Sequence, residues 1–324
     1  MVKLASAEMA EKKLATRAAF GATLAELAEE GVPVVAVDAD LTGSTTTKKF
    51  AAAAPENADK LFNCGIAEQN MIDVAAGLAL TGHVAYTGSF AVFGTGRAYD
   101  QIRNTVCYSN LDVKICPTHA GVSVGPDGGS HQMLEDVSLM RGLPNMRVLV
   151  PADYAAARAA IKLAAKTPGP VYVRMGRAAV PCVYDGDVEL ELGCAYVLRE
   201  GTDATVVACG VEIREALAAA DALAEEGISI EVIDAFSVKP LDEDTITASV
   251  AKTGCCVVAE EHSVHGGLGS AVAECLARKN PAPCEFVGVQ DRFGKSGEFE
   301  ELLGYFNLDA AAIVEAVKRA QGRK

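Results

Sequence analysis

Tryptophan is absent from this 324-residue chain, and aromatic residues of all kinds make up only 6% of it. Half of the residues are nevertheless hydrophobic, with alanine and valine abundant, so there is enough apolar material for real cores. At this length, two or three domains are expected. The composition suits alternating strands and helices better than a β-sandwich.

Positive charge is also scarce. The chain carries 29 Lys and Arg residues against 43 Asp and Glu residues, which gives a formal net charge of -14. Non-specific binding to nucleic acid or to an anionic membrane needs basic patches, so the composition argues against both. An anionic substrate would need a local cluster of positive side chains.

Two further absences concern cysteine spacing and hydrophobic runs. The ten cysteines include the adjacent pair Cys255 and Cys256 but no C-x-x-C, which favours buried thiols in a reducing compartment. No apolar run approaches the roughly 20 residues that span a bilayer. The start of the chain, MVKLASAEMAEKK, has no apolar core of signal-peptide length. We therefore expect a soluble, cytoplasmic protein.

Strand-like and helix-like patterns alternate along the chain. Helical spacing runs from Leu14 to Leu27, a continuous apolar run at 32–40 predicts a strand, and a further helix is predicted from Glu68 to Leu80. This alternation predicts a doubly wound, mainly parallel α/β sheet. An acidic, turn-rich segment at 181–194 marks a boundary, after which the pattern restarts. We expect one domain at 1–185 and a smaller one at 195–324.

Ligands of open parallel sheets bind beyond the carboxyl ends of the strands, and His119 of the first domain follows such an end. His119 and His131, two of only five histidines, bracket the glycine-rich loop AGVSVGPDGGS, which carries Asp127. This is the strongest chemical signal in the residues alone. A pair of solvated loop histidines would give the same pattern.

Other polar or aromatic positions have ordinary structural explanations. Glu68 stands in a first helical turn, where an acid interacts favourably with the helix dipole. Phe90 and Phe93 could stack on a planar ring, but their spacing alone favours an aromatic pair in a core. The stretch HSVHGGLGSAVAE lacks the full G-x-G-x-x-G spacing and is a weak phosphate-site signal. Glu260 and Glu261 before it are expected to be solvated or to hydrogen-bond a loop.

Three stretches resemble a known family. GIAEQNMIDVAAGLALTG, GSFAVFGTGRAYDQIRN and THAGVSVGPDGGSHQMLEDVSLMRGLPNMRVLVPAD are similar to the pyrimidine-binding domain of transketolases, and the following domain resembles their C-terminal domain. Ordinary transketolases carry a further N-terminal domain. Its G-D-G motif and a later Asn bind a divalent metal such as Mg²⁺ and the diphosphate of thiamine diphosphate. This chain has no G-D-G, so it looks like the C-terminal subunit of a split transketolase.

The resemblance implies which residues bind the cofactor. Glu68 matches the glutamate that hydrogen-bonds the pyrimidine ring of thiamine diphosphate, and Phe90 and Phe93 match aromatics that stack on this ring. The next family aromatic is Gly96 here, and Tyr99 is a candidate to replace it. Asp40 and Leu41 match an Asp-Leu pair of the family that contacts the cofactor near its thiazolium ring.

The resemblance also implies a sugar phosphate site. His119 and His131 match histidines that hydrogen-bond the donor sugar and assist proton transfers, and Asp127 matches an aspartate that contacts a sugar hydroxyl. The groups that hold the phosphate correspond to Arg17, Ser44 and Arg174. Arginine suits this task because its planar fork binds two oxygens.

The implied activity is transfer of a two-carbon ketol unit from a ketose phosphate to an aldose phosphate, the chemistry of the pentose phosphate pathway. The implied assembly is an α2β2 heterotetramer with a separate diphosphate-binding subunit. Alternatives are a 1-deoxyxylulose-5-phosphate synthase-like enzyme, whose loop begins Arg-Ala-Gly rather than His119-Ala-Gly, and a 2-oxo acid dehydrogenase beta subunit, which lacks the His–Asp–His set. A non-catalytic, transketolase-like regulatory subunit is the third.

Overall fold

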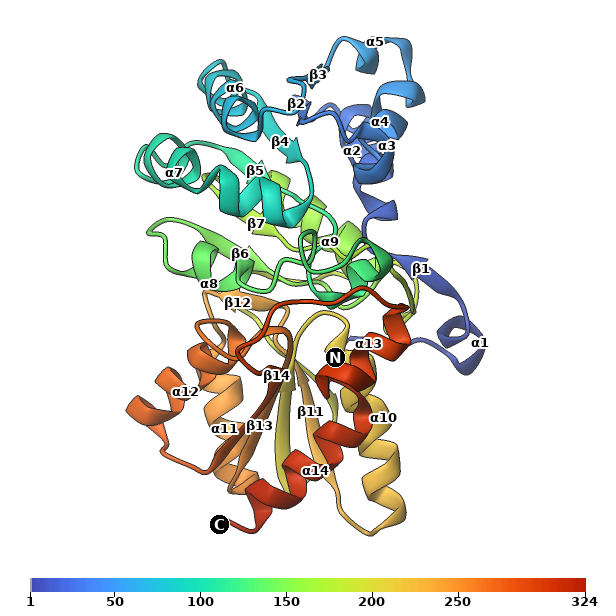
Figure 1. The fold of residues 1–324 in the computed structure, drawn as a ribbon, viewed down its shortest axis with the longest axis vertical. Coiled ribbons are helices and arrows are strands. Elements are labelled where there is room, and N and C mark those ends of the chain that lie inside the picture. The colour runs from blue at the N-terminus through green and yellow to red at the C-terminus, as the bar shows by residue number, and fades with distance from the viewer. Residues whose placement is uncertain (1) are drawn as a thin grey trace.

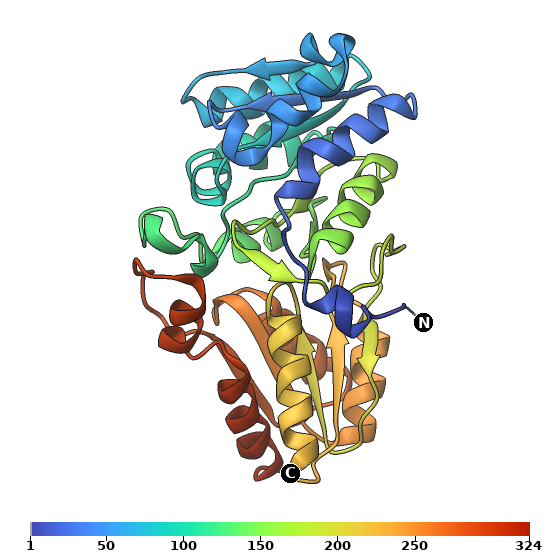
Figure 2. The ribbon, with the colours of Figure 1, turned by 90° about the vertical axis from the view of Figure 1, so that its right-hand side faces the viewer.

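The computed structural model describes residues 2–324, so Met1, at the start of the expected first domain, lies outside it. The chain forms two lobes stacked along the long axis of the molecule (Figure 1). The first lobe lies at the top of Figures 1 and 2, and the C-terminus lies at the far end of the second. Each lobe is a sheet covered by helices on both faces, so the predicted doubly wound α/β fold is confirmed.

The first lobe is built on a seven-stranded sheet of order β12-β6-β7-β5-β4-β2-β3. All of its strand pairs are parallel except β12 with β6. Its strands are β2 (Val34–Asp38), β3 (Leu61–Asn63), β4 (Val84–Gly88), β5 (Val113–Ile115), β6 (Arg147–Leu149), β7 (Val171–Val173) and β12 (Ser237–Lys239). β12 comes from beyond the predicted boundary, so the second lobe contributes an edge strand to the first sheet.

Helices cover both faces of this sheet. α2 and α9 pack on one face, and α6 and α8 pack on the other. The helices of this lobe are α2 (Ala18–Glu29), α3 (Thr42–Thr45), α4 (Thr47–Ala53), α5 (Pro55–Ala58), α6 (Glu68–Leu80), α7 (Tyr99–Gln101), α8 (Asp136–Arg141) and α9 (Tyr154–Lys166). The predicted helix from Glu68 to Leu80 is confirmed to the residue.

The N-terminal segment does not form the continuous helix that its spacing predicts. α1 (Ala7–Ala10) is a single turn, and β1 (Lys13–Ala15) follows it. β1 pairs antiparallel with β8 (Ala179–Pro181), so Leu14 belongs to a two-stranded sheet and not to a helix. Long-range backbone pairing has overridden the local periodicity here, as tertiary context often does.

The second lobe has a five-stranded sheet of order β14-β13-β10-β11-β9, in which only β9 is antiparallel. Its strands are β9 (Tyr196–Arg199), β10 (Ala204–Ala208), β11 (Ile230–Asp234), β13 (Cys256–Ser263) and β14 (Cys284–Val289). Its helices are α10 (Glu212–Glu225), α11 (Glu243–Thr253), α12 (Leu268–Lys279), α13 (Phe299–Phe306) and α14 (Ala310–Gln321).

The lobes share their hydrophobic cores. One buried cluster includes α2 and α9 together with α10 and α14, and the other includes α6 together with α11 and α12. This continuity fixes the second lobe against the first. Within residues 2–324, no helix is long and apolar enough to cross a membrane.

Candidate active site

The chemically notable residues of the first lobe gather at the carboxyl ends of its parallel strands. Asp38 ends β2, Ser89 and Phe90 follow β4, and Thr118 and His119 follow β5. A bridge between Phe90 and Thr118 continues the β4–β5 pairing beyond the strands. The predicted ligand edge of the sheet is therefore where these side chains meet.

Glu68 begins α6 and is buried, with only 2% of its surface exposed. Both of its carboxylate oxygens accept hydrogen bonds from Nη1 of Arg97, at 3.0 and 2.9 Å. Arg97 keeps half of its side chain exposed and lies 4.7 Å from the centroid of the Phe93 ring. The helix N-terminus and Arg97 both favour a negative charge at this buried position.

Phe90 and Phe93 lie nearly parallel, 16° apart, with their ring centroids separated by 6.1 Å. The expectation of a core pair holds for Phe90, which is buried, but not for Phe93, which is only half-buried and whose other ring contacts are His131 and Arg97. Phe90 also stacks on His119, with centroids 3.7 Å apart. The rings thus join the Glu68 end of the site to the histidine loop.

Tyr99 does not extend this aromatic pair. Its hydroxyl donates to the backbone carbonyl of Leu139 at 3.4 Å, and its ring packs against the α6 side of the core. At Gly96, a Cβ atom would meet only the end of Met133, at 3.9 Å. A side chain at position 96, where the family has an aromatic residue, would therefore contact Met133. Tyr99 packs in the core and does not take the place of that aromatic.

The loop from His119 to His131 carries both histidines on the same side as the aromatic pair. His119 is buried and has a positive φ of 62°, and its Nδ1 hydrogen-bonds the Thr118 hydroxyl at 2.7 Å. His131 packs edge-on against Phe93, with centroids 5.4 Å apart. The predicted clustering of the two histidines is present in space as well as in sequence.

The charge state of His119 follows from its surroundings. Burial, and then the positive charges of Arg17 and Arg177 and the neighbouring His131, lower the pKa of His119 to about 3. Its imidazole is therefore neutral at physiological pH and can donate one hydrogen bond and accept another.

A positive cluster lies beside this loop. Arg17 is half-buried, and its Nη1 donates to the backbone carbonyl of Ser44 at 2.8 Å. Burial and the nearby Arg177 lower the pKa of Arg17, whereas the exposed Asp127 raises it. The Arg177 Nη1 donates to the Val124 carbonyl at 3.0 Å, within the histidine loop. The acidic chain thus has the local positive site that an anionic substrate needs.

Arg174, which was expected in this cluster, is elsewhere. Its Nε donates to Asp136 at 2.7 Å, its Nη2 donates to the Glu261 carbonyl at 2.9 Å, and its side chain is 7% exposed. The Asp136 and Glu261 carboxylates raise the pKa of Arg174. All of its donating groups are directed into the protein, so it is not free to hold a phosphate. The second arginine of VYVRMGR, Arg177, lies beside Arg17 and the histidine loop instead.

The Asp40–Leu41 loop is shaped by a third residue, Asp38. Buried Asp38 accepts hydrogen bonds from the Leu41 N–H at 2.6 Å and the Thr45 hydroxyl at 2.7 Å, and burial raises its pKa. Asp40 is exposed, has a positive φ of 63°, and exchanges two 3.1 Å hydrogen bonds with Asn63. Asp40 therefore lies at the rim of the site and Asp38 supports it from within.

The second lobe supports the histidine loop from below. Glu261 of β13 accepts a hydrogen bond from the Ser123 N–H, and Gln132 donates to the Lys295 carbonyl at 2.9 Å. A Cβ atom at Gly129 would lie 2.7 Å from the Gly294 carbonyl oxygen, so only glycine fits this approach. Of the two expectations for Glu261, solvation or a hydrogen bond to a loop, the second is confirmed, since only 3% of Glu261 is exposed and it accepts from the loop residue Ser123. Figure 1 shows the segment before α13 passing beneath the loop.

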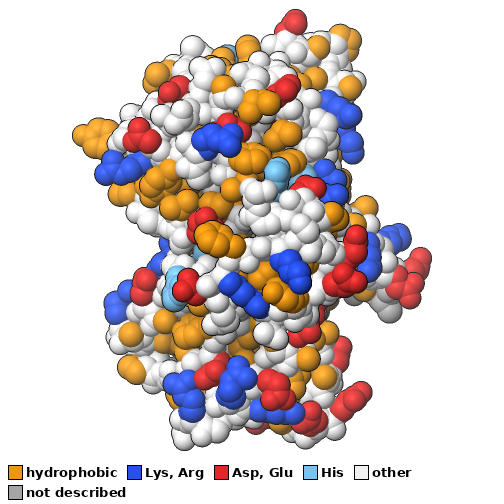
Figure 3. All heavy atoms as spheres, viewed as in Figure 1, with side chains coloured by type: hydrophobic (Ala, Val, Ile, Leu, Met, Phe, Trp, Pro, Cys, Tyr) orange, Lys and Arg blue, Asp and Glu red, His pale blue; other side chains and the backbone are white. Residues whose placement is uncertain are grey.

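The surface of this region is chemically mixed. In Figure 3, histidine surface in the upper half adjoins hydrophobic side chains and basic side chains.

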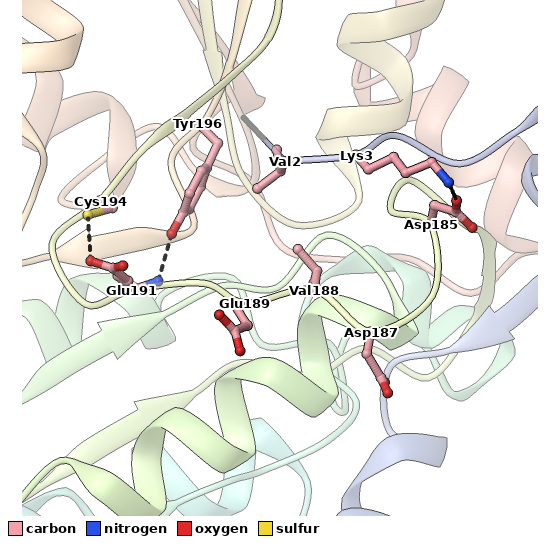
Figure 4. Close-up of a pocket in the computed structure, with 9 residues that line it drawn as sticks. All are labelled: Val2, Lys3, Asp185, Asp187, Val188, Glu189, Glu191, Cys194 and Tyr196. Carbon is pink, nitrogen blue, oxygen red and sulfur yellow. Dashed lines mark hydrogen bonds and ion pairs between the residues drawn. The ribbon is translucent and has the colours of Figure 1, made fainter.

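A separate pocket, shown in Figure 4, is lined by the boundary segment and by Val2 and Lys3. It carries four carboxylates and one cation, that of Lys3; the carboxylates belong to Asp185, Asp187, Glu189 and Glu191. Its negative charge makes it unsuitable for a sugar phosphate.

Comparison with known proteins identifies the family. The model of the transketolase pyrimidine-binding domain matches residues 12–183, and that of the transketolase C-terminal domain matches residues 193–313. The chain belongs to the transketolase family. It is 45% identical to a protein of Methanocaldococcus jannaschii named as a transketolase C-terminal section, over 93% of this chain and 94% of that protein.

Two further relatives show which part of a transketolase this is. Human transketolase is 37% identical over 94% of this chain, but the match spans only 49% of the human protein. A solved structure described as a split gene transketolase, an inactive β4 tetramer, has 48% identity and a TM-score of 0.87, covering 96% of this chain and 99% of that one. The chain is the C-terminal subunit of a split transketolase, and membership of the family implies thiamine diphosphate.

The depressed pKa of His119 predicts how the stability of this transketolase subunit depends on pH. Above pH 6.5 the residue is neutral in both folded and unfolded states. Between pH 6.5 and about 3, His119 binds a proton in the unfolded state but not in the folded state, so stability is lost as the pH falls.

The variant His119→Asn tests this pH dependence, because asparagine tolerates the positive φ at this position. When the pH falls from 7 to 5, the unfolding free energy of the variant should decrease by about 1–2 kcal/mol less than that of the parent chain. Urea titrations at both pH values measure this, and equal losses would contradict it.

Proposed function

We propose that this subunit supplies the pyrimidine-binding and sugar-binding half of an active site that transfers a two-carbon ketol unit from a ketose phosphate to an aldose phosphate. The proposal rests on the convergence of buried Glu68, the Phe90–Phe93 pair, the histidine loop and the Arg17–Arg177 cluster. A scaffold or regulatory subunit would have no need of this arrangement.

The residues fit one end of thiamine diphosphate and not the other. The buried carboxylate, together with the half-buried ring of Phe93, suits a planar, nitrogen-containing pyrimidine. Among residues 2–324, no group of three or more His, Cys, Asp or Glu side chains could hold a metal ion. We infer that the diphosphate and a Mg²⁺ ion are held by a separate subunit. When bound, the cofactor would supply the nucleophilic carbon for the transfer.

Glu68 would share a proton with the pyrimidine ring nitrogen and so tune the protonation of the ring. The apolar face of α6 behind it, with Met71 and Ile72 fully buried, keeps this end of the site dry and rigid. Arg97 lies on the open side of Glu68 and is half exposed, so it can move aside when the ring enters. Phe93 would stack on the ring, and Asp40 and Leu41 would contact the cofactor nearer its thiazolium.

The sugar would lie against the histidine loop. His119, neutral and fixed by Thr118, would hydrogen-bond the donor sugar, and His131 would assist proton transfers. Asp127 would contact a sugar hydroxyl at the exposed end of the loop. Arg17 and Arg177 would hold the phosphate, together with Ser44.

We propose an α2β2 assembly with the diphosphate-binding subunit, in keeping with this division of the site. The β4 tetramer of the related split transketolase is inactive, which supports the proposal that chains of this kind need a partner. We propose a phosphorylated or related ketose as the donor sugar. Relatives at 42% and 38% identity are named for 6-deoxy-6-sulfo-D-fructose and for apulose 4-phosphate.

Reconstitution tests the proposed activity. This chain, its diphosphate-binding partner, thiamine diphosphate and Mg²⁺ should together transfer a ketol unit from xylulose 5-phosphate to ribose 5-phosphate, and each subunit alone should not. Full activity of this chain alone would overturn the divided site. Turnover of pyruvate, with no transfer between sugars, would favour the deoxyxylulose phosphate synthase-like or 2-oxo acid dehydrogenase-like alternatives.

The position of Arg177 predicts a defect confined to substrate binding. Arg177→Ala removes one of two positive groups for the phosphate and should raise the KM for phosphorylated sugars by roughly 10- to 100-fold, since hydrogen bonds to charged groups contribute about 1.5–3 kcal/mol. The fold should be unaffected, because Arg177 is half exposed and its guanidinium donates to the carbonyl of a loop residue, Val124. Steady-state kinetics of the assembled enzyme measure the effect, and an unchanged KM would remove Arg177 from the phosphate site.

A further inference from the structure

Two cysteines that lie far apart in the sequence meet in the second lobe. Cys256 begins β13 and Cys284 begins β14, and the register places them directly opposite each other on these neighbouring parallel strands. Each thiol shifts the pKa of the other, so the two side chains lie close together. Neighbouring positions on paired strands are within the range of Cα separations that a disulfide spans.

The two thiols differ in access. Cys256 is fully buried in the core between the sheet and α12, whereas Cys284 is half-buried. Cys284 lines an open surface pocket of about 630 Å³, together with Arg323 and His265. A small oxidant can therefore reach Cys284 first, with Cys256 immediately behind it.

The reactivity of Cys284 also sets it apart. Nine of the ten cysteines have a pKa raised by their surroundings. The pKa of Cys284 alone is lowered, first by the neighbouring Cys256 thiol and then by the charge of Arg323, against the opposing effect of burial. Since the thiolate is the reactive form of cysteine, this is the thiol that oxidants should attack first.

We propose that Cys284 and Cys256 form a thiol oxidation site, in which Cys284 is the attacking thiol and Cys256 the resolving thiol. With hydrogen peroxide as oxidant, the Cys284 sulfur bonds to one peroxide oxygen, the O–O bond breaks, and the departing hydroxide takes the thiol proton as water. The Cys256 sulfur then attacks the Cys284 sulfur. The S–S bond forms, the S–O bond breaks, and the second hydroxide leaves as water with the Cys256 proton. Two thiols are oxidised and one peroxide is reduced to two waters.

The product would join the two strands that support the histidine loop. β13 carries Glu261, which binds the Ser123 N–H, and β14 leads into the segment whose Lys295 carbonyl accepts from Gln132. In Figure 1 the two strands run side by side through the centre of the second lobe. The site is separate from the proposed active site, and the inference does not depend on the proposed function.

Peptide mapping tests the inference. The reduced, folded chain is treated with limiting hydrogen peroxide, remaining thiols are blocked with N-ethylmaleimide, and the digest is analysed by mass spectrometry. The expected product is one intramolecular disulfide joining Cys256 and Cys284, reversible by dithiothreitol. In the absence of peroxide, N-ethylmaleimide should label Cys284 at least about tenfold faster than the similarly half-buried Cys194.

Variants separate the two roles. Cys284→Ser, at a half-buried position, should fold and form no disulfide, whereas the control Cys194→Ser should behave as the parent chain. Cys256→Ser should leave Cys284 as a sulfenic acid that dimedone traps. Labelling of Cys284 no faster than Cys194, or a disulfide that joins Cys284 to Cys275 or to another chain, would overturn the proposal.

Discussion

Replacing Glu68 by glutamine should lower the rate of ketol transfer by the assembled enzyme by about 10²- to 10⁴-fold, the usual contribution of a positioned acid–base group. The amide has the size of the carboxyl group but cannot share a proton with the pyrimidine ring in the same way. The chain should still fold and still assemble, since burying a neutral amide costs less than burying a charge. The measurement is kcat under saturating cofactor and substrates.

Asp73→Asn provides the matched control. Asp73 lies on the same helix, one and a half turns further along, and is exposed. The same chemical change there should leave kcat within about twofold of the parent enzyme, as surface substitutions usually do. A near-normal rate for Glu68→Gln would remove Glu68 from the mechanism, whatever the control shows.

Replacing Arg174 by alanine should cost about 3–5 kcal/mol of unfolding free energy. The substitution leaves the carboxylates of Asp136 and Glu261 buried, 0% and 3% exposed, without their cation. It also breaks the connection between the lobes that the Arg174 bond to the Glu261 carbonyl makes. Urea denaturation of the purified chain measures the loss.

Arg177→Ala is the natural comparison, since the two arginines are three residues apart. Its unfolding free energy should lie within about 1 kcal/mol of the parent chain, in line with the loss of one hydrogen bond. The structure thus separates a stabilising arginine from a substrate-facing one. A stable Arg174→Ala chain with a raised KM, beside an unstable Arg177→Ala chain, would reverse that assignment.

Much of this arrangement could be predicted from the pattern of residues. The apolar run before Asp38 and Asp40 predicted a buried strand, and the spacing after Glu68 predicted the helix, because period and burial are local properties of the sequence. The placement of His119 after a strand predicted that it would face the ligand edge of the sheet. These inferences needed only the geometry of parallel sheets.

Other features depend on contacts between distant segments and were not predictable in this way. Whether Arg174 or Arg177 faces the site is decided by the partners of Arg174, one of which comes from the second lobe. Phe93 and Arg97, which pairs with Glu68, both lie in the π-helical segment at 92–97. Such turns often occur at functional sites, but a sequence with ordinary helical spacing does not reveal them.

Cofactor binding distinguishes a divided site, in which this subunit holds one end of thiamine diphosphate and its partner holds the other, from a site complete in one chain. Calorimetric titration with thiamine diphosphate and Mg²⁺ should be made on this chain, on the diphosphate-binding partner, and on their equimolar mixture. We expect tight binding by the mixture, and binding at least about 100-fold weaker by this chain alone, because in the proposed divided site the partner makes the contacts to the charged end. Glu68→Gln should weaken binding by the mixture, whereas Asp73→Asn should not. Equal affinity of this chain alone and of the mixture would contradict the divided site.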